Sequence, residues 1–173
     1  MTRRLTRGLL LAVLAAFGAV ALGQTNARAA TGEWVQEFIE RPAEDGGDIR
    51  YAILFEENQQ SLQLGCVRNR IERVLIGFPT SAGGVAAPIA REPEVEYSFD
   101  NEAFEPADWP LFEAGSIEVP RGAKSSAITR RIMTSLRFKV RASGRDGQWY
   151  EADFNVVGGQ QLLADMLDAC GIK

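Results

Sequence analysis

The chain has 173 residues, with 19 lysines and arginines, 23 aspartates and glutamates and no histidine, which gives a net charge of −4. A net negative charge argues against nucleic acid as the main partner. The lack of histidine excludes Ser-His and Cys-His nucleophile pairs and the usual histidine-rich zinc sites.

The first 29 residues have the three parts of a signal peptide. Three arginines precede the run from 9 to 22, whose 14 residues carry no charge. That run is too short to span a bilayer comfortably, and Ala27-Arg28-Ala29 supplies the small-x-small pattern of a cleavage site. We expect cleavage after Ala29, a periplasmic or secreted location and no stable membrane anchor afterwards. An uncleaved anchor is the alternative.

Residues 30–173 are expected to form one domain, since about 144 residues is the commonest domain size. Cleavage removes four arginines, which leaves 15 basic against 23 acidic residues and a net charge of −8. The charge is −12 over residues 30–120 and +4 over residues 121–173. The basic end is either a patch for an anionic partner or one half of a fold whose halves neutralise each other. The second interpretation is favoured because charge runs are usually solvated faces.

Cys66 and Cys170 are the only cysteines. An even count in an exported chain predicts a disulfide, and two cysteines allow one pairing. The bridge would close a loop of about 100 residues, for which chain entropy predicts a stabilisation of about 4 to 5 kcal/mol. A redox-active pair is the alternative, but there is no Cys-x-x-Cys motif and no histidine to activate a thiol. We expect no metal and no cofactor.

Alternating apolar residues predict short antiparallel strands at 33–40, 50–56, 62–66, 74–78, 95–99 and 116–119. In the second strand, Tyr51, Ile53 and Phe55 share one face. Residues 79–90 are expected to form a long loop, and residues 101–114 are expected to be irregular. Trp34 and Trp109 are expected in the core or at its edge.

The last third of the chain has the clearest pattern. A short helix is expected from a serine cap at 125 or 126 through Ser135. Residues 136–142 and 150–156 alternate apolar with charged or polar side chains around a turn at 143–148, which predicts a hairpin. An amphipathic helix is expected from about Gln160 to Ala169, with Cys170 on its apolar stripe. The fold class is therefore α+β, a mostly antiparallel sheet with two helices and one disulfide.

The charged face of this hairpin holds the candidate partner contacts, which are Arg137, Lys139, Arg141 and Trp149. Trp149 directly follows the turn and is the best candidate for a partly exposed aromatic residue. A cap over the ends of the sheet is the alternative role for this side chain.

The register of the hairpin follows from parity. Apolar residues have even numbers on both strands, so the numbers of opposed residues must add to an even sum. A sum of 292 leaves a loop that Asp146-Gly147 can turn. It also puts Arg141 opposite Glu151 and Lys139 opposite an aspartate at 153. We therefore interpret the cations mainly as a register device rather than as a binding patch.

Carboxylates are frequent between residues 92 and 108: Glu92, Glu94, Glu96, Asp100, Glu102, Glu105 and Asp108. Two of them could act as the acid and base of a hydrolase, although nothing in their spacing requires this. The acidic turn at 44–48 lacks the ligand alternation of an EF-hand loop, so a plain turn is favoured there.

Several spaced residues resemble a known family. They are a tryptophan near the mature start, Leu62-x-Leu64-x-Cys66, a strand ending in Asp100, Trp109, Phe154-x-Val156-x-Gly158, Leu162, Leu163 and Ala169-Cys170-Gly171. This pattern resembles the small periplasmic two-cysteine proteins associated with type VI secretion and their relatives outside secretion loci. The resemblance implies the fold and the same cysteine pairing, and it carries over no catalytic residue. The invasion-associated locus B family is a second resemblance, whose cysteine arrangement fits less well.

Export, a disulfide and missing catalytic groups predict a non-enzymatic protein with a binding or assembly role in the cell envelope. Its partner would be an envelope protein or a glycan. One alternative is an envelope hydrolase that uses paired carboxylates in 92–108. The other is an inhibitor of another enzyme that presents an exposed loop such as 80–90.

Overall fold

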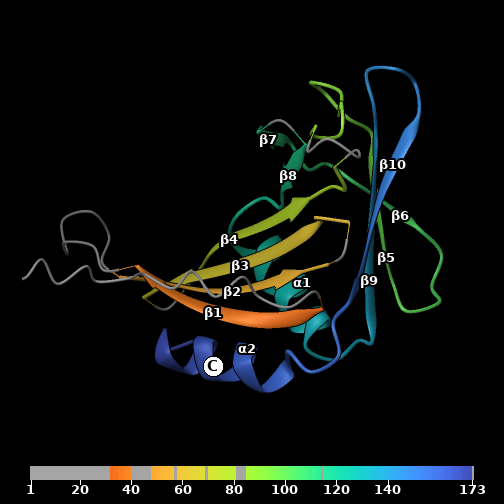
Figure 1. Cartoon of the computed structure of the whole chain (residues 1–173). Coiled ribbons are helices and arrows are strands. Elements are labelled where there is room, and N and C mark those ends of the chain that lie inside the picture. The colour runs from red at the N-terminus through yellow and green to blue at the C-terminus, as the bar shows by residue number, and fades with distance from the viewer. Residues whose placement is uncertain are drawn as a thin grey trace, which may run out of the picture.

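The computed structural model of the chain describes residues 32–39, 48–56, 58–68, 70–80, 85–113 and 115–172. The expected signal peptide at 1–29 and most of the acidic turn at 44–48 lie outside these ranges. Two antiparallel sheets and two helices make up the described part (Figure 1). The predicted α+β class is confirmed.

The larger sheet has six strands in the order β1-β2-β3-β4-β8-β7. Its strands are β1 (Glu33–Ile39), β2 (Ile49–Phe55), β3 (Ser61–Val67), β4 (Arg70–Gly77), β7 (Leu111–Glu113) and β8 (Ser116–Glu118). The expected meander of three strands is confirmed as β2, β3 and β4, with β1 added to its edge.

The smaller sheet has four strands in the order β10-β9-β5-β6. Its strands are β5 (Val95–Phe99), β6 (Glu105–Ala107), β9 (Arg137–Ser143) and β10 (Trp149–Asn155). The prediction that residues 101–114 are irregular was wrong, because β6 and β7 both lie there. β6 contains a proline and β7 has two adjacent apolar residues, so neither segment shows the alternation that predicts a strand.

Helix α1 (Ala123–Ile132) contacts β4, and helix α2 (Gln160–Ala169) contacts β2 (Figure 1). Both helices and both sheets share one apolar core. The predicted serine cap of α1 was wrong. The helix begins after Gly122, and Ser125 lies buried in its first turn with its hydroxyl donating to the Gly122 carbonyl oxygen at 3.0 Å.

The face of β2 that carries Tyr51, Ile53 and Phe55 is not the one that enters the main core. Ala52 and Leu54 point into the main core, while Tyr51 and Ile53 belong to a separate cluster, and Phe55 is 39% exposed. The strand is apolar on both faces, so alternation alone cannot decide its orientation. Pairing with β3 decides it, because Ala52 and Leu54 lie opposite two leucines that face the core.

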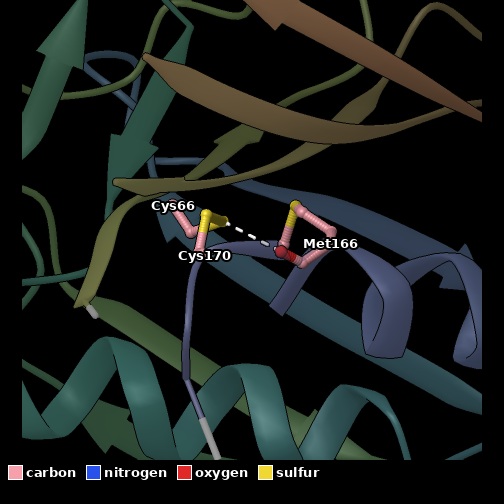
Figure 2. Close-up of a disulfide and its surroundings, with 3 residues drawn as sticks. All are labelled: Cys66, Met166 and Cys170. Carbon is pink, nitrogen blue, oxygen red and sulfur yellow. Dashed lines mark hydrogen bonds between the residues drawn. A yellow bond between two sulfur atoms is a disulfide. The ribbon is translucent and has the colours of Figure 1, made fainter. Parts of the chain in front are cut away.

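The predicted disulfide is confirmed. Cys66 on β3 and Cys170 after α2 are bonded, with their Cα atoms 6.2 Å apart (Figure 2). Cys66 is fully buried, and its sulfur lies 3.4 Å from the carbonyl oxygen of Met166 on α2. The bridge joins residues 104 apart in sequence and fixes the end of the chain to the larger sheet.

Loss of the disulfide should destabilise the fold strongly. We expect Cys66→Ala/Cys170→Ala to lower the free energy of unfolding by about 4 kcal/mol, because the unfolded chain regains the entropy of a long loop. Urea denaturation followed by circular dichroism measures this loss. A reductant should shift the wild-type midpoint downward and leave that of the double variant unchanged. Equal midpoints for the wild-type protein and the double variant in the absence of reductant would contradict this role.

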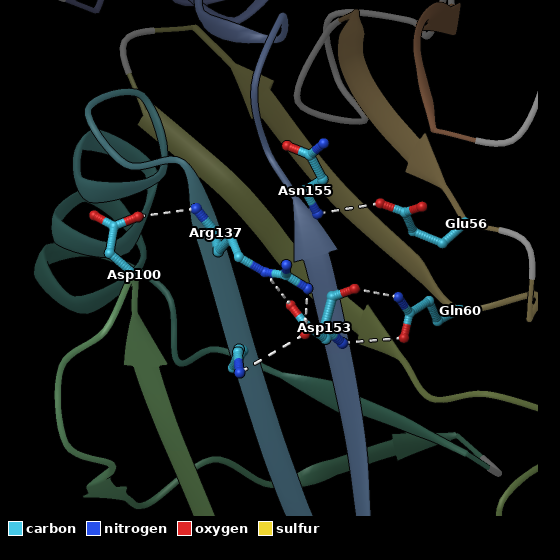
Figure 3. Close-up of polar contacts among 7 residues, drawn as sticks. Glu56, Gln60, Asp100, Arg137, Asp153 and Asn155 are labelled. Atoms are coloured by element: carbon cyan, nitrogen blue, oxygen red, sulfur yellow. Dashed lines mark hydrogen bonds and ion pairs between the residues drawn. The ribbon is translucent and has the colours of Figure 1, made fainter.

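Two side chains from the turn between β2 and β3 bind the outer edge of β10 (Figure 3). The buried carboxamide of Gln60 accepts the N–H of Asp153 at 3.1 Å and donates to the carbonyl oxygen of the same residue. A carboxylate oxygen of Glu56 accepts the N–H of Asn155 at 3.1 Å. Gln60 thus takes the position that a neighbouring strand would occupy, and it links the two sheets.

Removal of the Gln60 carboxamide should destabilise the fold more than truncation of an exposed glutamine does. We expect Gln60→Ala to lower the free energy of unfolding by about 2 kcal/mol, because both backbone groups of Asp153 lose their partner. Gln148→Ala is the control, since Gln148 is exposed in the hairpin turn and should change stability by less than about 0.5 kcal/mol. Equal urea midpoints for the two variants would rule out the link.

Candidate functional site

The β9–β10 hairpin has the predicted register. Arg141 opposes Glu151, Lys139 opposes Asp153, and all other pairs follow the sum of 292. The turn lies at the predicted place, with the N–H of Gly147 donating to the carbonyl oxygen of residue 144 at 3.1 Å. The charged residues therefore gather on one side of the hairpin. We call this surface the hairpin face, formed by the side chains of Arg137, Lys139, Arg141, Trp149, Glu151 and Asp153.

The turn is held by a carboxylate with two donors. Asp146 accepts the N–H of Gln148 at 3.1 Å and the hydroxyl of Tyr150 at 2.6 Å. These hydrogen bonds favour the charged carboxylate, so the pKa of Asp146 is lowered and the pKa of Tyr150 is raised. The start of β10, where Trp149 lies, is fixed by these contacts.

Two cations of the hairpin face share one carboxylate. Arg137 binds Asp153 through two hydrogen bonds, of 3.1 Å from Nε and 2.5 Å from Nη2 (Figure 3). The ammonium of Lys139 lies 3.8 Å from the same carboxylate. The hydrogen bonds from Arg137 to Asp153 raise the pKa of the guanidinium. Both side chains are thus paired within the hairpin, which agrees with a role in strand pairing.

The start of β9 is fixed by Asp100, which follows β5. Its carboxylate accepts the backbone N–H groups of Leu136 and Arg137 at 2.7 and 3.0 Å. These two hydrogen bonds lower the pKa of Asp100. The residue has a positive φ of 52°, a conformation that aspartate adopts more easily than most residues.

Arg141 pairs with an acid that the sequence did not reveal. Its Nε donates to Glu96 on β5 at 2.6 Å, although Glu151 is its cross-strand neighbour on β10. Its guanidinium also lies over the rings of Phe104 and Trp149, at 4.3 and 5.0 Å from their centroids. Arg141 therefore holds the Trp149 ring in place and is drawn away from Glu151.

Trp149 differs from the other tryptophans of the chain. Its side chain is 44% exposed, while Trp34 and Trp109 are buried. An exposed indole braced by a guanidinium offers a large apolar surface that is already ordered. Such a side chain loses little conformational freedom when a partner covers it.

The acidic segment borders a groove between β5 and α1. Glu102 and Glu105 line a hollow of about 140 Å³, and Asp108 lines a second hollow of about 220 Å³. Both hollows share Tyr97, whose ring stacks on that of Trp109. The two hollows together approach the size of a small ligand site.

Each carboxylate of the first hollow already has a partner. Glu102 forms an ion pair with Arg131, and Glu105 accepts the hydroxyl of Tyr97 at 3.0 Å. Burial, together with this hydrogen bond, raises the pKa of Tyr97. Both glutamates are exposed. A general acid of the glycosidase type needs a carboxyl group shielded from water, and neither glutamate has that environment.

The end of the loop at 80–90, residues 88–90, is fixed against β9 and the turn that follows it. Ile89 forms a bridge with residue 144, its carbonyl oxygen accepts Nε of Arg145 at 3.2 Å, and its side chain is buried. Ala87 is also buried, whereas Val85 is exposed. Residues 81–84 lie outside the described ranges. An inhibitory loop would therefore have to act through the part of this segment that precedes Pro88.

Comparisons of the chain with family models, with curated proteins and with solved structures find no match. The two family resemblances stay predictions. Within the described ranges, no three carboxylate or cysteine side chains are arranged to hold a metal ion. Neither of the two helices is long and apolar enough to cross a bilayer.

A charge reversal at Lys139 tests the cations of the hairpin face. We expect Lys139→Glu to lower the free energy of unfolding by about 0.5 to 1 kcal/mol, because it puts a second carboxylate opposite Asp153. Lys139→Gln should have about half that effect. Thermal denaturation measures both variants, and partner binding should stay intact. Loss of binding to an anionic surface without a change in melting temperature would instead make this face an anion-binding patch.

Proposed function

We propose that this chain is an exported, non-enzymatic protein that binds a partner in the cell envelope through the β9–β10 hairpin. The observation that carries the proposal is Trp149, the exposed indole held in place by Arg141. Partner-binding surfaces are enriched in tryptophan and arginine, and a single well-placed tryptophan often contributes much of the binding energy.

Export is supported by the signal-like residues 1–29 and by the disulfide, because disulfides persist mainly in oxidising compartments. The resemblance to small periplasmic two-cysteine proteins points the same way. We infer that the mature protein begins at Ala30 and works in the periplasm or outside the cell.

The hydrolase alternative has one observation in its favour. Glu102 and Glu105 border the same hollow, within the segment from which the hydrolase alternative takes its two carboxylates. Their exposure and their existing partners argue for a structural role. The experiment below therefore includes a measurement that would detect hydrolysis.

A photoreactive tryptophan analogue that keeps the indole ring, introduced at position 149 of the full chain in its own host, tests the proposal. We expect a crosslinked adduct of defined mass in the envelope fraction, on protein whose N-terminus is Ala30. The control position is Val157, which is 52% exposed just beyond the other end of β10 and should give no such adduct. No adduct at 149, or the same adducts at both positions, would overturn the proposal.

The purified wild-type protein, incubated with peptidoglycan, should release no soluble fragments from it. Fragments that disappear in Glu105→Gln would assign the chain to the hydrolases instead. Glu94→Gln is the matched control, because Glu94 is exposed in the same acidic segment and lines neither hollow.

A further inference from the structure

The backbone N–H and C=O groups of successive residues of β10 point alternately toward β9 and away from it. The even-numbered residues of β10 direct their backbone N–H and C=O groups toward β9. The hydrogen bonds from the Gly144 N–H to the Gln148 carbonyl oxygen and from the Val156 N–H to the Leu136 carbonyl oxygen show this at the two ends of the ladder. Odd-numbered residues of β9 bond toward β5 and its neighbours instead. The N–H of Ser143, for example, donates to the carbonyl oxygen of Glu94 at 2.9 Å. The odd-numbered residues of β10 therefore direct their N–H and C=O groups away from the sheet.

One half of this outer edge is closed. Gln60 binds the N–H and C=O groups of Asp153, and Glu56 binds the N–H of Asn155 (Figure 3). Natural sheets commonly cover or charge their edges in this way, which prevents uncontrolled strand addition. The cover lies at the C-terminal end of β10.

The other half of the edge has no such cover within the described residues. There, no hydrogen bond joins the outward backbone groups of Trp149 or Glu151 to another part of the chain. Both side chains are exposed. The outward N–H and C=O groups of Trp149 and Glu151 thus form an open stretch of strand edge, next to the indole that Arg141 contacts.

The charged side chain on the open half of this edge is acidic. Glu151 has an exposed carboxylate, and its cross-strand neighbour Arg141 is bound to Glu96. A neighbouring strand would place a side chain within about 5.5 Å of Glu151, where a cation is favourable and a second acid is not.

From these features we propose that an extended, lysine- or arginine-bearing peptide segment of a partner protein adds to β10 as a further strand at Trp149 and Glu151. The inference rests on the proposed function and narrows its partner to a protein. Backbone hydrogen bonds provide the attachment, the indole covers an apolar side chain of the segment, and Glu151 pairs with its cation. Gln60 sets the end of the added strand, because the edge beyond it is occupied.

A second copy of this chain fits the same edge less well. Self-pairing of two β10 edges would bring two Glu151 carboxylates into one short ladder, on protomers that each carry a net charge of −8 after cleavage. The exported protein should therefore be monomeric in sedimentation experiments. A dimer that dissociates in Glu151→Pro would replace the proposed peptide with a second copy.

Amide hydrogen exchange of the full chain, purified after export, gives the first test. We expect the amides of Trp149 and Glu151 to exchange at least tenfold faster than those of Asp153 and Asn155, which Gln60 and Glu56 protect. The amide of Ala152, within the β9 ladder, is the internal reference for a protected group. Slow exchange at Glu151 would mean that the edge is already covered, and the proposal would fail.

Proline at position 151 gives the second test. It removes an outward N–H and leaves the bonds to β9 in place, and proline is tolerated at strand edges for this reason. We expect Glu151→Pro to reduce the adduct at position 149 at least tenfold. Glu151→Ala, which keeps the N–H and loses the charge, should reduce it two- to fivefold. Both variants should keep a wild-type circular dichroism spectrum.

A peptide probe keeps the proposal testable if the proline variant does not fold. A peptide of alternating lysine and valine should shift the amide resonances of Trp149 and Glu151 in a saturable way. The same peptide with N-methyl groups along one edge should lose this effect, because it cannot bond to β10. No shift with the unmodified peptide would overturn the inference. An adduct at 149 that persists undiminished in Glu151→Pro would also overturn it, while the proposed function would stand.

Discussion

The hydrogen bonds between the Gln60 carboxamide and the backbone of Asp153 determine how the two sheets meet. Through them, the turn after β2 substitutes for a strand beside β10. A buried carboxamide without a partner is costly, so this contact holds the turn after β2 against β10, alongside the apolar core that both sheets share. The same contact divides the edge of β10 into a closed half and an open half. The candidate site depends on that division, because it leaves Trp149 next to unpaired strand edge rather than next to covered edge.

The disulfide acts at the opposite end of the molecule. It joins β3 to the residue after α2, and so keeps the C-terminal helix against the larger sheet. Between β10 and α2 the chain has only a short connection, residues 156–159. Gln60 holds the edge of the β9–β10 hairpin, and α2 follows directly after its end. The hairpin therefore has little freedom to move relative to the larger sheet. A partner bound at Trp149 would therefore meet a preorganised surface, which lowers the entropy lost on binding.

The sequence was sufficient for the features that depend on local pattern. Strict alternation on both strands and the Asp146-Gly147 turn predicted the hairpin register, and the cysteine count predicted the disulfide. It was insufficient where the answer depends on neighbours in space. The orientation of β2 could not be predicted, because the strand is apolar on both faces. The partner of Arg141 could not be predicted either. Glu96 was one of seven carboxylates between residues 92 and 108, and only the pairing of β5 with β9 brings it beside the guanidinium.

The uneven charge of the chain is partly balanced by contacts between its two parts. Arg121, Arg131 and Arg141, all from residues 121–173, each form an ion pair with a glutamate from residues 30–120. These contacts agree with neutralisation across one fold rather than with a free basic patch. They also change the local balance on the hairpin face. Because Arg141 bonds to Glu96, the carboxylate of Glu151 lies exposed at the open edge without the cation that opposes it in the ladder. The hairpin face thus presents an exposed carboxylate beside its exposed tryptophan, rather than a free basic patch for an anionic partner.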